Sequence, residues 1–268
     1  MQVIIYDNAD QVAVAAADWV SALINQKPNA VLGLATGSTP ISLYKQLVNK
    51  HQQENLSFKD ITSFNLDEYL HIDEKNPQSY RSFMQTNLFD HVDIDVNRTH
   101  LPTCQPDENP RVQGLAYEEK IAGAGGIDLQ ILGIGANGHI GFNEPSSSLA
   151  SRTRIKTLTQ KTIEDNSRLF NDEEEQPTMA MTMGIATIMD ARYVLLLATG
   201  ENKAKAVNDM VTGALSASCP ASVLQMHENA IVLLDKEAAS QLEDKDYYQW
   251  ADSQNRILND KFGYFHNY

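Results

Sequence analysis

The stretch Ile127-Asp-Leu-Gln-Ile-Leu-Gly-Ile-Gly-Ala-Asn-Gly-His-Ile-Gly-Phe-Asn-Glu-Pro145 decides how the rest of the chain is interpreted. Its opening part, 127–132, is mostly apolar and is predicted to be a buried strand. Four glycines follow within nine residues, at positions 133, 135, 138 and 141. They disfavour a regular helix and let the backbone approach a ligand closely. The sequence therefore predicts a strand that ends in a tight glycine loop.

This loop contains three polar side chains that could carry chemistry: Asn137, His139 and Glu144. Open α/β sheets bind ligands beyond the carboxyl ends of their strands, which is where this loop would lie. A single histidine in a glycine loop is more often an ordinary surface residue. Other predicted strands of this chain also end in polar residues, however, and we therefore interpret these three residues as candidate catalytic groups.

The same loop also fits the dinucleotide-binding fingerprint through Gly133, Gly135 and Gly138. That fingerprint requires a helix that begins inside the motif, and an acidic residue about twenty positions later. Here Pro145 and three serines follow instead, and the later positions hold Arg152 and Arg154. Two arginines would suit a 2′-phosphate, so this alternative stays open, but the missing helix favours a catalytic loop.

Composition limits the class of protein. The 268 residues are 42% hydrophobic and 21% charged, which is ordinary for a soluble globular enzyme. A formal net charge of −14 disfavours nucleic acid or an anionic membrane as a partner. Cys104 and Cys219 form neither a disulfide framework nor a zinc-ligand pattern, so we expect a cytoplasmic protein without a metal. We expect no signal peptide and no membrane-spanning segment.

A second loop, Thr36-Gly37-Ser38-Thr39, follows the predicted strand 30–34. Thr39 is predicted to cap a helix over 41–48, with Pro40 at its start. Backbone N–H groups, hydroxyls and a positive helix end together make a phosphate cradle. An ordinary capped turn between a strand and a helix is an equally good interpretation if this loop is considered alone.

Asp67 follows the predicted strand 61–66, and a carboxylate held rigidly at a strand tip suits abstraction of a carbon-bound proton. Lys203 lies near the start of a helix after the strand 193–198, where it opposes the helix dipole and suggests a nearby anion. Arg168 lies in a predicted short helix over 164–170. Further strands are predicted at 3–6, 153–158 and 230–234, with a helix capped by Asn8 and Gln11. The aromatic C-terminal tail is predicted to dock on the core or on a neighbouring subunit.

By its motifs the chain resembles the glucosamine-6-phosphate deaminase family. The resemblance rests on Leu-Gly-Leu-Ala-Thr-Gly-Ser-Thr-Pro over 32–40, Phe-Asn-Leu-Asp-Glu-Tyr over 64–69, the loop 133–145, and Ser-Leu-Ala-Ser-Arg-Thr-Arg-Ile-Lys-Thr-Leu over 148–158. It covers about residues 30 to 235. The resemblance implies one modified Rossmann-type α/β domain over 1–268, with a mostly parallel sheet and helices on both faces. It also implies that glucosamine 6-phosphate and water become fructose 6-phosphate and ammonia without a metal or an organic cofactor.

The resemblance assigns roles to the candidate residues. Asp67 would move the proton between C2 and C1, and His139 would open the sugar ring, with Glu144 orienting its imidazole. Some family members have an aspartate where this chain has Asn137, so the basicity of the imidazole would depend mainly on Glu144. The phosphate would be held by Thr36, Gly37, Ser38 and Thr39 together with Arg168 and Lys203.

Regulation is a further expectation from the resemblance. Hexameric members activated by N-acetylglucosamine 6-phosphate bind it between subunits, and this chain has the matching Ser147, Arg154 and Lys156. We therefore expect a homo-oligomer with this activator, although two cations on a solvated strand could simply offset an acidic protein. Two alternative functions are a 6-phosphogluconolactonase-like hydrolase and a catalytically silent sugar-phosphate sensor. Lactone hydrolysis needs no base at C2, and a silent sensor would be expected to lose Asp67 or His139.

Overall fold

The computed structural model describes residues 1–160, 163–164 and 176–262 of the chain. Its centre is a seven-stranded sheet in the order β1-β10-β9-β6-β2-β3-β5, in which every neighbouring pair is parallel. The strands are β1 (Gln2–Tyr6), β2 (Val31–Leu34), β3 (Thr62–Asn65), β5 (Thr99–His100), β6 (Leu129–Leu132), β9 (Tyr193–Ala198) and β10 (Ala230–Asp235). Four of them, β2, β6, β9 and β10, are almost wholly buried. Runs of apolar residues form such strands because helices cover both faces of a parallel sheet.

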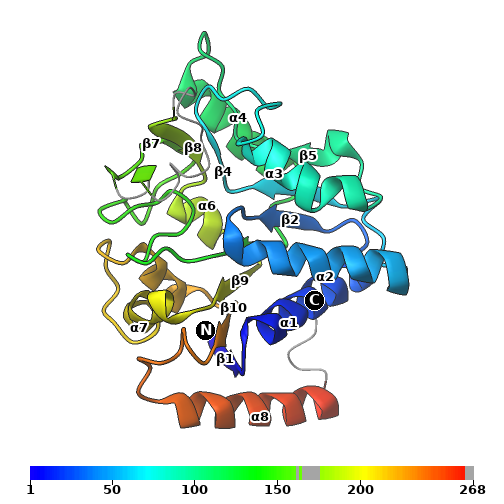
Figure 1. Cartoon of the computed structure of the whole chain (residues 1–268), viewed down its shortest axis with the longest axis vertical. Helices are drawn as coiled ribbons and strands as arrows, with labels where there is room; N and C mark the ends of the chain where they lie inside the picture. The colour runs from blue at the N-terminus through cyan, green and yellow to red at the C-terminus, as the bar shows by residue number, and fades with distance from the viewer. Residues whose placement is uncertain (161–162, 165–175, 263–268) are drawn as a thin grey trace.

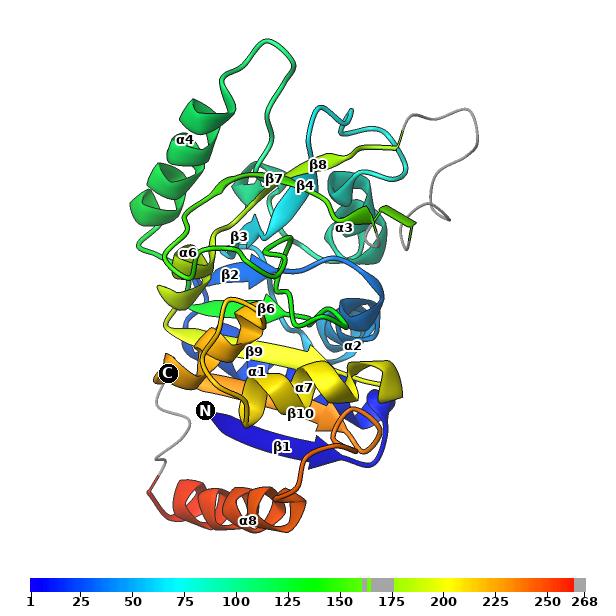
Figure 2. The ribbon, with the colours of Figure 1, turned by 90° about the vertical axis from the view of Figure 1, so that its left-hand side faces the viewer.

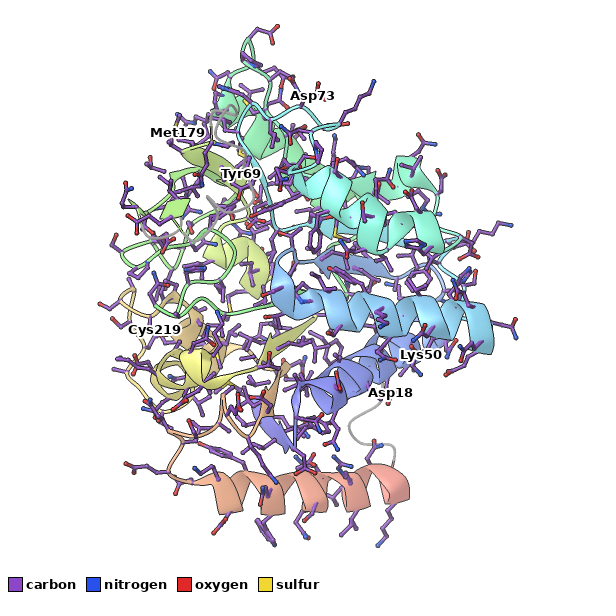
Figure 3. The ribbon with its side chains drawn as sticks, in the orientation of Figure 1. Asp18, Lys50, Tyr69, Asp73, Met179 and Cys219 are labelled. Carbon is purple, nitrogen blue, oxygen red and sulfur yellow. The ribbon has the colours of Figure 1, made fainter. Side chains whose placement is uncertain are left out.

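The helices lie on both faces of this sheet, with α7 in front of it and α1 behind it in Figure 2. They are α1 (Ala9–Gln26), α2 (Ser38–Glu54), α3 (Tyr80–Asn87), α4 (Pro110–Gly123), α6 (Ile185–Met189), α7 (Ala204–Val211) and α8 (Lys245–Phe262), with 3-10 turns at Phe89–His91, Val96–Arg98, Glu201–Lys203 and Pro220–Met226. On the back face, Lys50 of α2 forms an ion pair with Asp18 of α1 at 2.9 Å (Figure 3). The predicted α/β fold with a mostly parallel sheet is confirmed.

The N-termini of α1 and α2 differ in how they are capped. The side chain of Asn8 accepts the N–H of Gln11, so the predicted cap of α1 is confirmed. The prediction that Thr39 caps the next helix is wrong, because α2 begins at Ser38 with Gly37 as its N-cap. Gly37 has φ 100°, which only glycine adopts easily, and no side chain caps this helix end. The first N–H groups of α2 are therefore not occupied by a side-chain cap.

Strand order reverses between the neighbours β2 and β6. The chain continues from β2 through α2 to β3 on one side, whereas β6 leads through a second sheet to β9 on the other side. Such a reversal is the position at which open α/β sheets bind ligands beyond the carboxyl ends of the strands. The two glycine loops of interest follow these two strands, so the topology brings them to the same edge of the sheet.

The second sheet has three antiparallel strands in the order β4-β8-β7, and it lies at the top of Figure 1. They are β4 (Asp67–Tyr69), β7 (Arg154–Thr157) and β8 (Met179–Thr182). Asp67 is therefore the first residue of a separate strand rather than a loop residue at the tip of β3. Leu66 joins the two sheets, because its N–H donates to Leu34 O at 2.9 Å and its carbonyl accepts from Met183 N at 2.7 Å.

Helix α8 lies alongside β1, beyond the edge of the main sheet (Figures 1 and 2). Tyr248 packs against the main core, as predicted for the tail, whereas Tyr247 and Trp250 are each 60% exposed. The other predicted tail aromatics, Tyr264, Phe265 and Tyr268, lie outside the described residues. No helix in the described part of the chain is both long and apolar enough to cross a membrane.

The start of α6 provides a test of the packing between the two sheets. A Cβ atom at Gly184 would lie 2.1 Å from the carbonyl oxygen of Ser151, which is backbone and cannot rotate away. We expect Gly184→Ala to lower the free energy of unfolding by about 1–3 kcal/mol, the usual cost of overpacking. Urea denaturation measures this. The control is Gly123→Ala in α4, where nothing lies within 4 Å, and it should not destabilise the protein. Equal effects of the two substitutions would contradict the steric argument.

Candidate active site

The loop 133–145 follows β6 without forming a helix, since the next regular element after it is β7. This arrangement contradicts the dinucleotide alternative, which needs a helix that starts inside the glycine motif. The glycine at 135 is required by the imidazole of His139, because a Cβ there would lie 2.2 Å from His139 Cε1. Gly138 and Gly141 have positive φ angles of 84° and 55°. The glycines therefore shape the loop around the histidine.

His139, Asn137 and Glu144 form a chain of hydrogen bonds. Asn137 Nδ2 donates to Glu144 Oε2 at 2.8 Å, so Asn137 Oδ1 faces His139 Nδ1 at 2.7 Å. Because that oxygen can only accept, Nδ1 carries the proton and Nε2 is left as the basic nitrogen. Glu144 Oε2 also lies 3.4 Å from Nδ1, an ion-pair distance when the imidazole is protonated. Asn137 thus stands between the histidine and the carboxylate that the sequence suggested as its direct partner.

Glu144 is buried, with 3% of its surface exposed, and Thr159 donates to its second oxygen at 3.3 Å. Its backbone is held as well, since the N–H of Ser147 donates to Glu144 O at 3.0 Å. A buried carboxylate that is hydrogen-bonded at both oxygens has a fixed orientation. Asn137 and His139 are fixed in turn, because their hydrogen bonds lead back to this carboxylate.

The loop is tied to the second sheet by Asn143, a residue that the sequence analysis did not identify. Its fully buried side chain donates to Ile140 O at 2.9 Å and to Met183 O at 2.8 Å, and its oxygen accepts from Arg154 Nη1 at 2.9 Å. The N–H of Phe142 donates to Thr182 Oγ1 at 3.2 Å. The loop and the second sheet therefore form one unit.

Asp67 faces this loop from β4. Its Oδ2 would lie 3.3 Å from a Cβ placed on Gly141, and its strand partner is Thr182. Only 6% of its surface is exposed. Burial and the neighbouring charge of Glu68 raise its pKa to about 8, although the N–H of Phe142 acts in the opposite direction. A carboxyl group of high proton affinity therefore lies beside the histidine loop.

Aromatic rings and a second carboxylate surround Asp67. Tyr80 stacks on Phe142 with ring centroids 6.1 Å apart, and it lies 4.9 Å from the ring of Tyr69. Burial raises the pKa of the Tyr80 phenol well above its ordinary value, and the charge of Asp67 contributes to this shift. Glu68 is 1% exposed. Tyr80 and Glu68 were not among the residues predicted from the sequence, although Glu68 stands beside Asp67 in the Asp-Glu-Tyr motif.

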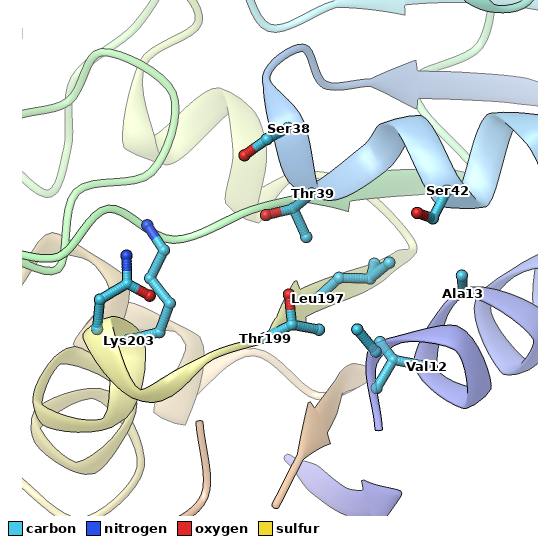
Figure 4. A pocket seen from close by; sticks show the side chains of 10 residues that line it. Val12, Ala13, Ser38, Thr39, Ser42, Leu197, Thr199 and Lys203 are labelled. Carbon is cyan, nitrogen blue, oxygen red and sulfur yellow. The ribbon is translucent and has the colours of Figure 1, made fainter. Parts of the chain in front are cut away.

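The predicted phosphate loop lines a cavity of about 500 Å³. Ser38 and Thr39, in the first turn of α2, lie on one side of it, and Thr199 and Lys203, which follow β9, lie on the other. In Figure 4 the side chain of Lys203 extends toward Ser38 and Thr39. An uncapped helix start that faces a lysine is suited to bind an anion. Thr36 and Gly37 precede this turn, and Arg168 lies outside the described residues.

The three residues expected to bind an activator lie near the end of the loop and on β7. Ser147 is 3% exposed, and its Oγ has no hydrogen-bond partner among the described residues. Arg154 is half-buried, and burial lowers the pKa of its guanidinium. Lys156 lies two residues further along the same strand, so the two cations share one face of β7. In the described part of the chain, no three His, Cys, Asp or Glu side chains are grouped so that they could hold a metal ion.

Comparison with known proteins identifies the family of the chain. The chain belongs to the family described as glucosamine-6-phosphate isomerases/6-phosphogluconolactonase, which matches residues 6–233. It is 74% identical over 268 residues to the glucosamine-6-phosphate deaminase of Colwellia psychrerythraea, with 100% of both chains covered. It is 63% identical over 265 residues to the enzyme of the same name from Pseudoalteromonas translucida, with 99% of both chains covered.

Solved structures confirm the fold. One described as a monomeric glucosamine-6-phosphate deaminase has a TM-score of 0.86 and 42% identity, and the match covers 90% of this chain and 99% of that one. The 6-phosphogluconolactonase of Leishmania guyanensis has a TM-score of 0.69 and 20% identity, with 90% and 98% covered. At that identity the second similarity concerns the fold alone.

The buried carboxyl group of Asp67 makes stability depend on pH. Its folded pKa of about 8 lies above its ordinary value of 3.8, so between these values the folded state holds a proton that the unfolded chain has released. The free energy of unfolding therefore decreases as pH rises through this interval. Asp67→Asn removes this titration, so the variant should exceed the wild type in stability by about 1–3 kcal/mol at about pH 9 and by little at about pH 5. Urea denaturation at both pH values measures this, and an equal difference at both would contradict it.

Proposed function

We propose that the chain is a glucosamine-6-phosphate deaminase, which converts glucosamine 6-phosphate and water to fructose 6-phosphate and ammonia. The observation that carries the proposal is the pairing of a buried carboxyl group, Asp67, with the hydrogen-bonded chain of His139, Asn137 and Glu144. A cavity suited to an anion lies at the same edge of the main sheet. Its family and its full-length relatives support the same reaction. The substrate is a small amino-sugar phosphate of amino-sugar metabolism.

Ring opening is assigned to His139. The cyclic sugar opens when a group removes the proton of the C1 hydroxyl and returns a proton to the ring oxygen. An imidazole with a free Nε2 can do both near neutral pH. Asn137 holds Nδ1 at 2.7 Å and so fixes both the tautomer and the direction of the ring. Glu144 stabilises the imidazolium that forms, because its carboxylate lies 3.4 Å from Nδ1.

Isomerisation is assigned to Asp67. The carboxylate takes the proton from C2 of the open aldose, the C–H electrons form a C1–C2 double bond, and the π electrons of the C1 carbonyl move to its oxygen, which takes up a proton from water. Asp67 then returns its proton to C1 while the nitrogen lone pair forms a C2=N double bond. The product is a ketose imine, which water hydrolyses to fructose 6-phosphate and ammonia. Burial helps, because a desolvated carboxylate of raised pKa is a stronger base than one in water. The base must be ionised, so turnover should fall as pH decreases through its pKa.

The phosphate is assigned to the cavity between α2 and the segment after β9. The N–H groups of the first turn of α2, the hydroxyls of Ser38 and Thr39, and the ammonium group of Lys203 would hold it. Thr36 and Gly37 shape the turn, and Arg168 remains a predicted contact. Because the phosphate is remote from C1 and C2, its binding energy positions the sugar over the catalytic groups.

A lactonase function is less well supported. Lactone hydrolysis removes no proton from C2, so it gives no reason for a desolvated carboxyl group at position 67. The solved lactonases resemble this chain only at about a fifth of positions, which supports a common fold and no more. We place the reaction in the cytoplasm, a proposal consistent with Cys104 and Cys219, which are both buried free thiols.

The first prediction tests the reaction and its base together. The wild type should release ammonia from glucosamine 6-phosphate, and Asp67→Asn should lower kcat by about 10²–10⁴, the usual contribution of a positioned base, with KM little changed. A coupled assay of ammonia release measures both constants. A variant that retains most of its kcat would remove Asp67 from this role. A wild type that hydrolyses 6-phosphogluconolactone but releases no ammonia would overturn the proposed function.

A second prediction separates ring opening from isomerisation. His139→Gln should slow turnover of the cyclic substrate far more than turnover of an analogue that is already open at C1. Two glycines provide a matched pair. Gly135→Ala should have the same selective effect, because its Cβ would displace the imidazole of His139. Gly133→Ala is the control and should not have this effect, because a Cβ at that position would have no atom within 4 Å. A misplacement of about 1 Å costs about 10²-fold in rate. If both substrates are affected equally, His139 does not open the ring.

We further propose a homo-oligomer that N-acetylglucosamine 6-phosphate activates through Ser147, Arg154 and Lys156. The shared face of Arg154 and Lys156 on β7 suits one phosphate, and Ser147 has a buried Oγ without a hydrogen-bond partner among the described residues. One solved relative is described as monomeric. The proposal therefore depends on residues of this chain rather than on the family.

The regulatory proposal predicts that the acetylated sugar raises the apparent affinity for glucosamine 6-phosphate by about 5–150-fold, an ordinary allosteric coupling. Lys156→Ala should abolish this response, because it removes one of the two cations that would bind the activator phosphate. Initial rates with and without the acetylated sugar measure the response, and analytical ultracentrifugation measures the oligomeric state. A monomer, or rates that are hyperbolic and indifferent to the acetylated sugar, would contradict regulation and leave the catalytic proposal intact.

A further inference from the structure

Two neighbouring buried carboxyl groups on β4 have very different surroundings. Asp67 and Glu68 are consecutive residues of one strand, so their side chains leave it on opposite faces. Both are almost fully buried, at 6% and 1% exposed. The reaction proposed above uses Asp67 and gives Glu68 no part. A buried carboxylate is costly unless its oxygens are hydrogen-bonded, so the partners of Glu68 indicate what it does.

Glu68 accepts three backbone hydrogen bonds. Its Oε1 accepts from the N–H groups of Tyr69 and Tyr80, and its Oε2 accepts from Arg81, each at 2.9 Å. Tyr80 and Arg81 are the first two residues of α3, so the carboxylate lies at the positive end of that helix. Three such donors favour the charged form. Burial raises the pKa of Glu68 to about 7, whereas these donors oppose the rise.

Asp67 has far fewer donors. The N–H of Phe142, which also donates to Thr182 Oγ1 at 3.2 Å, is the one donor that lowers its pKa, and within the described part of the chain no cation is among the groups that shift it. The titratable groups that act on it from the packed elements are Glu68 on its own strand, Tyr80 on α3 and Tyr117 on α4. Arg81 of α3 interacts with Glu74, Glu68 and Tyr117 instead. When the two carboxyl groups hold one proton between them, these surroundings favour a protonated Asp67 and an ionised Glu68. Acid–base sites commonly separate two carboxyl groups in this way.

We propose that Glu68 is a positioning residue for the reaction, a buried negative charge that strengthens Asp67 as a base and clamps the first turn of α3 beside it. The clamp matters because Tyr80, whose N–H it holds, belongs to the aromatic group that packs on Phe142 of the histidine loop. The proposal rests on the proposed function, in which Asp67 takes the proton from C2. A carboxylate adjacent in sequence thus acts on the reaction without touching the sugar.

The test is the pH dependence of kcat in Glu68→Gln. Gln keeps the shape of the side chain and the acceptor for Tyr69 and Tyr80, and it removes the charge. Without that charge Asp67 should ionise at lower pH, so the acidic limb of the profile should move down by about one pH unit. The rate on the alkaline plateau should fall, because Asp67 is then a weaker base. The control is Glu119→Gln, the same change at an exposed position of α4, which should leave the limb in place.

A limb that stays in place while kcat falls at every pH would show that Glu68 only maintains structure, and it would overturn the proposal. A limb that moves to higher pH would also overturn it. The proposed function is judged separately, because Asp67→Asn tests the base itself. If Asp67→Asn is inactive and the Glu68→Gln profile matches the wild type, only the present inference fails. If Asp67→Asn keeps its kcat, Asp67 is not the base, and the inference about Glu68 is overturned with it.

If Glu68→Gln does not fold, the reciprocal measurement decides. Coupling between two sites acts equally in both directions. The last glutamate carboxyl to titrate in the wild type, followed by ¹³C NMR of labelled glutamate, should therefore titrate at lower pH in Asp67→Asn. An unchanged titration would overturn the proposal. The Asp67→Asn chain suits this measurement because removal of a desolvated carboxyl group should not destabilise the fold.

Discussion

The carboxamide of Asn143 is the contact on which the arrangement of the site depends. It is fully buried, and both of its ends are hydrogen-bonded, to the carbonyls of Ile140 and Met183 and to Arg154. Through it a loop from the main sheet is fixed to the strands of the second sheet. The loop carries His139, and the second sheet carries Asp67. Each of these hydrogen bonds contributes about 0.5–1.5 kcal/mol net, and a buried amide left without its partners would cost more, so the loop and the second sheet are held in one arrangement.

The site combines a rigid part and an open part. Glycines, the Asn137–Glu144 hydrogen bond and the buried β4 strand hold the proton-transfer groups in place. On the other side of the switch between β2 and β6, the uncapped start of α2 and Lys203 border a cavity that is large enough for a sugar phosphate. Such a division suits an isomerase, because a firmly held phosphate lets a small sugar reach groups that cannot move toward it.

Much of this could be predicted from the sequence. Apolar runs predicted the strands 30–34, 193–198 and 230–234, and Asn8 predicted the start of α1, because these signals are local. The cap of α2 was predicted wrongly at Thr39, because a threonine before a proline is a common helix cap. The helix instead begins at Ser38, since Gly37 adopts a φ of 100° and takes the cap position. Asp67 was expected at the tip of the strand 61–66, and its place in a separate strand could not be predicted because the partner strand, β8, lies more than a hundred residues later. Glu68 and Asn143 were missed for the same reason, as their roles depend on partners distant in the chain.

The two edges of the main sheet are closed in different ways, and this bears on how the protein stays dispersed at high concentration. A parallel sheet that ends in bare strands offers unpaired N–H and C=O groups to any other extended chain. At one edge β5 is only two residues long, too short to serve as a template. At the other, β1 is five residues long, and α8 lies along it. The C-terminal helix therefore covers the edge of β1. A chain without α8 would expose this edge strand, the longer of the two, and would be prone to aggregate through it.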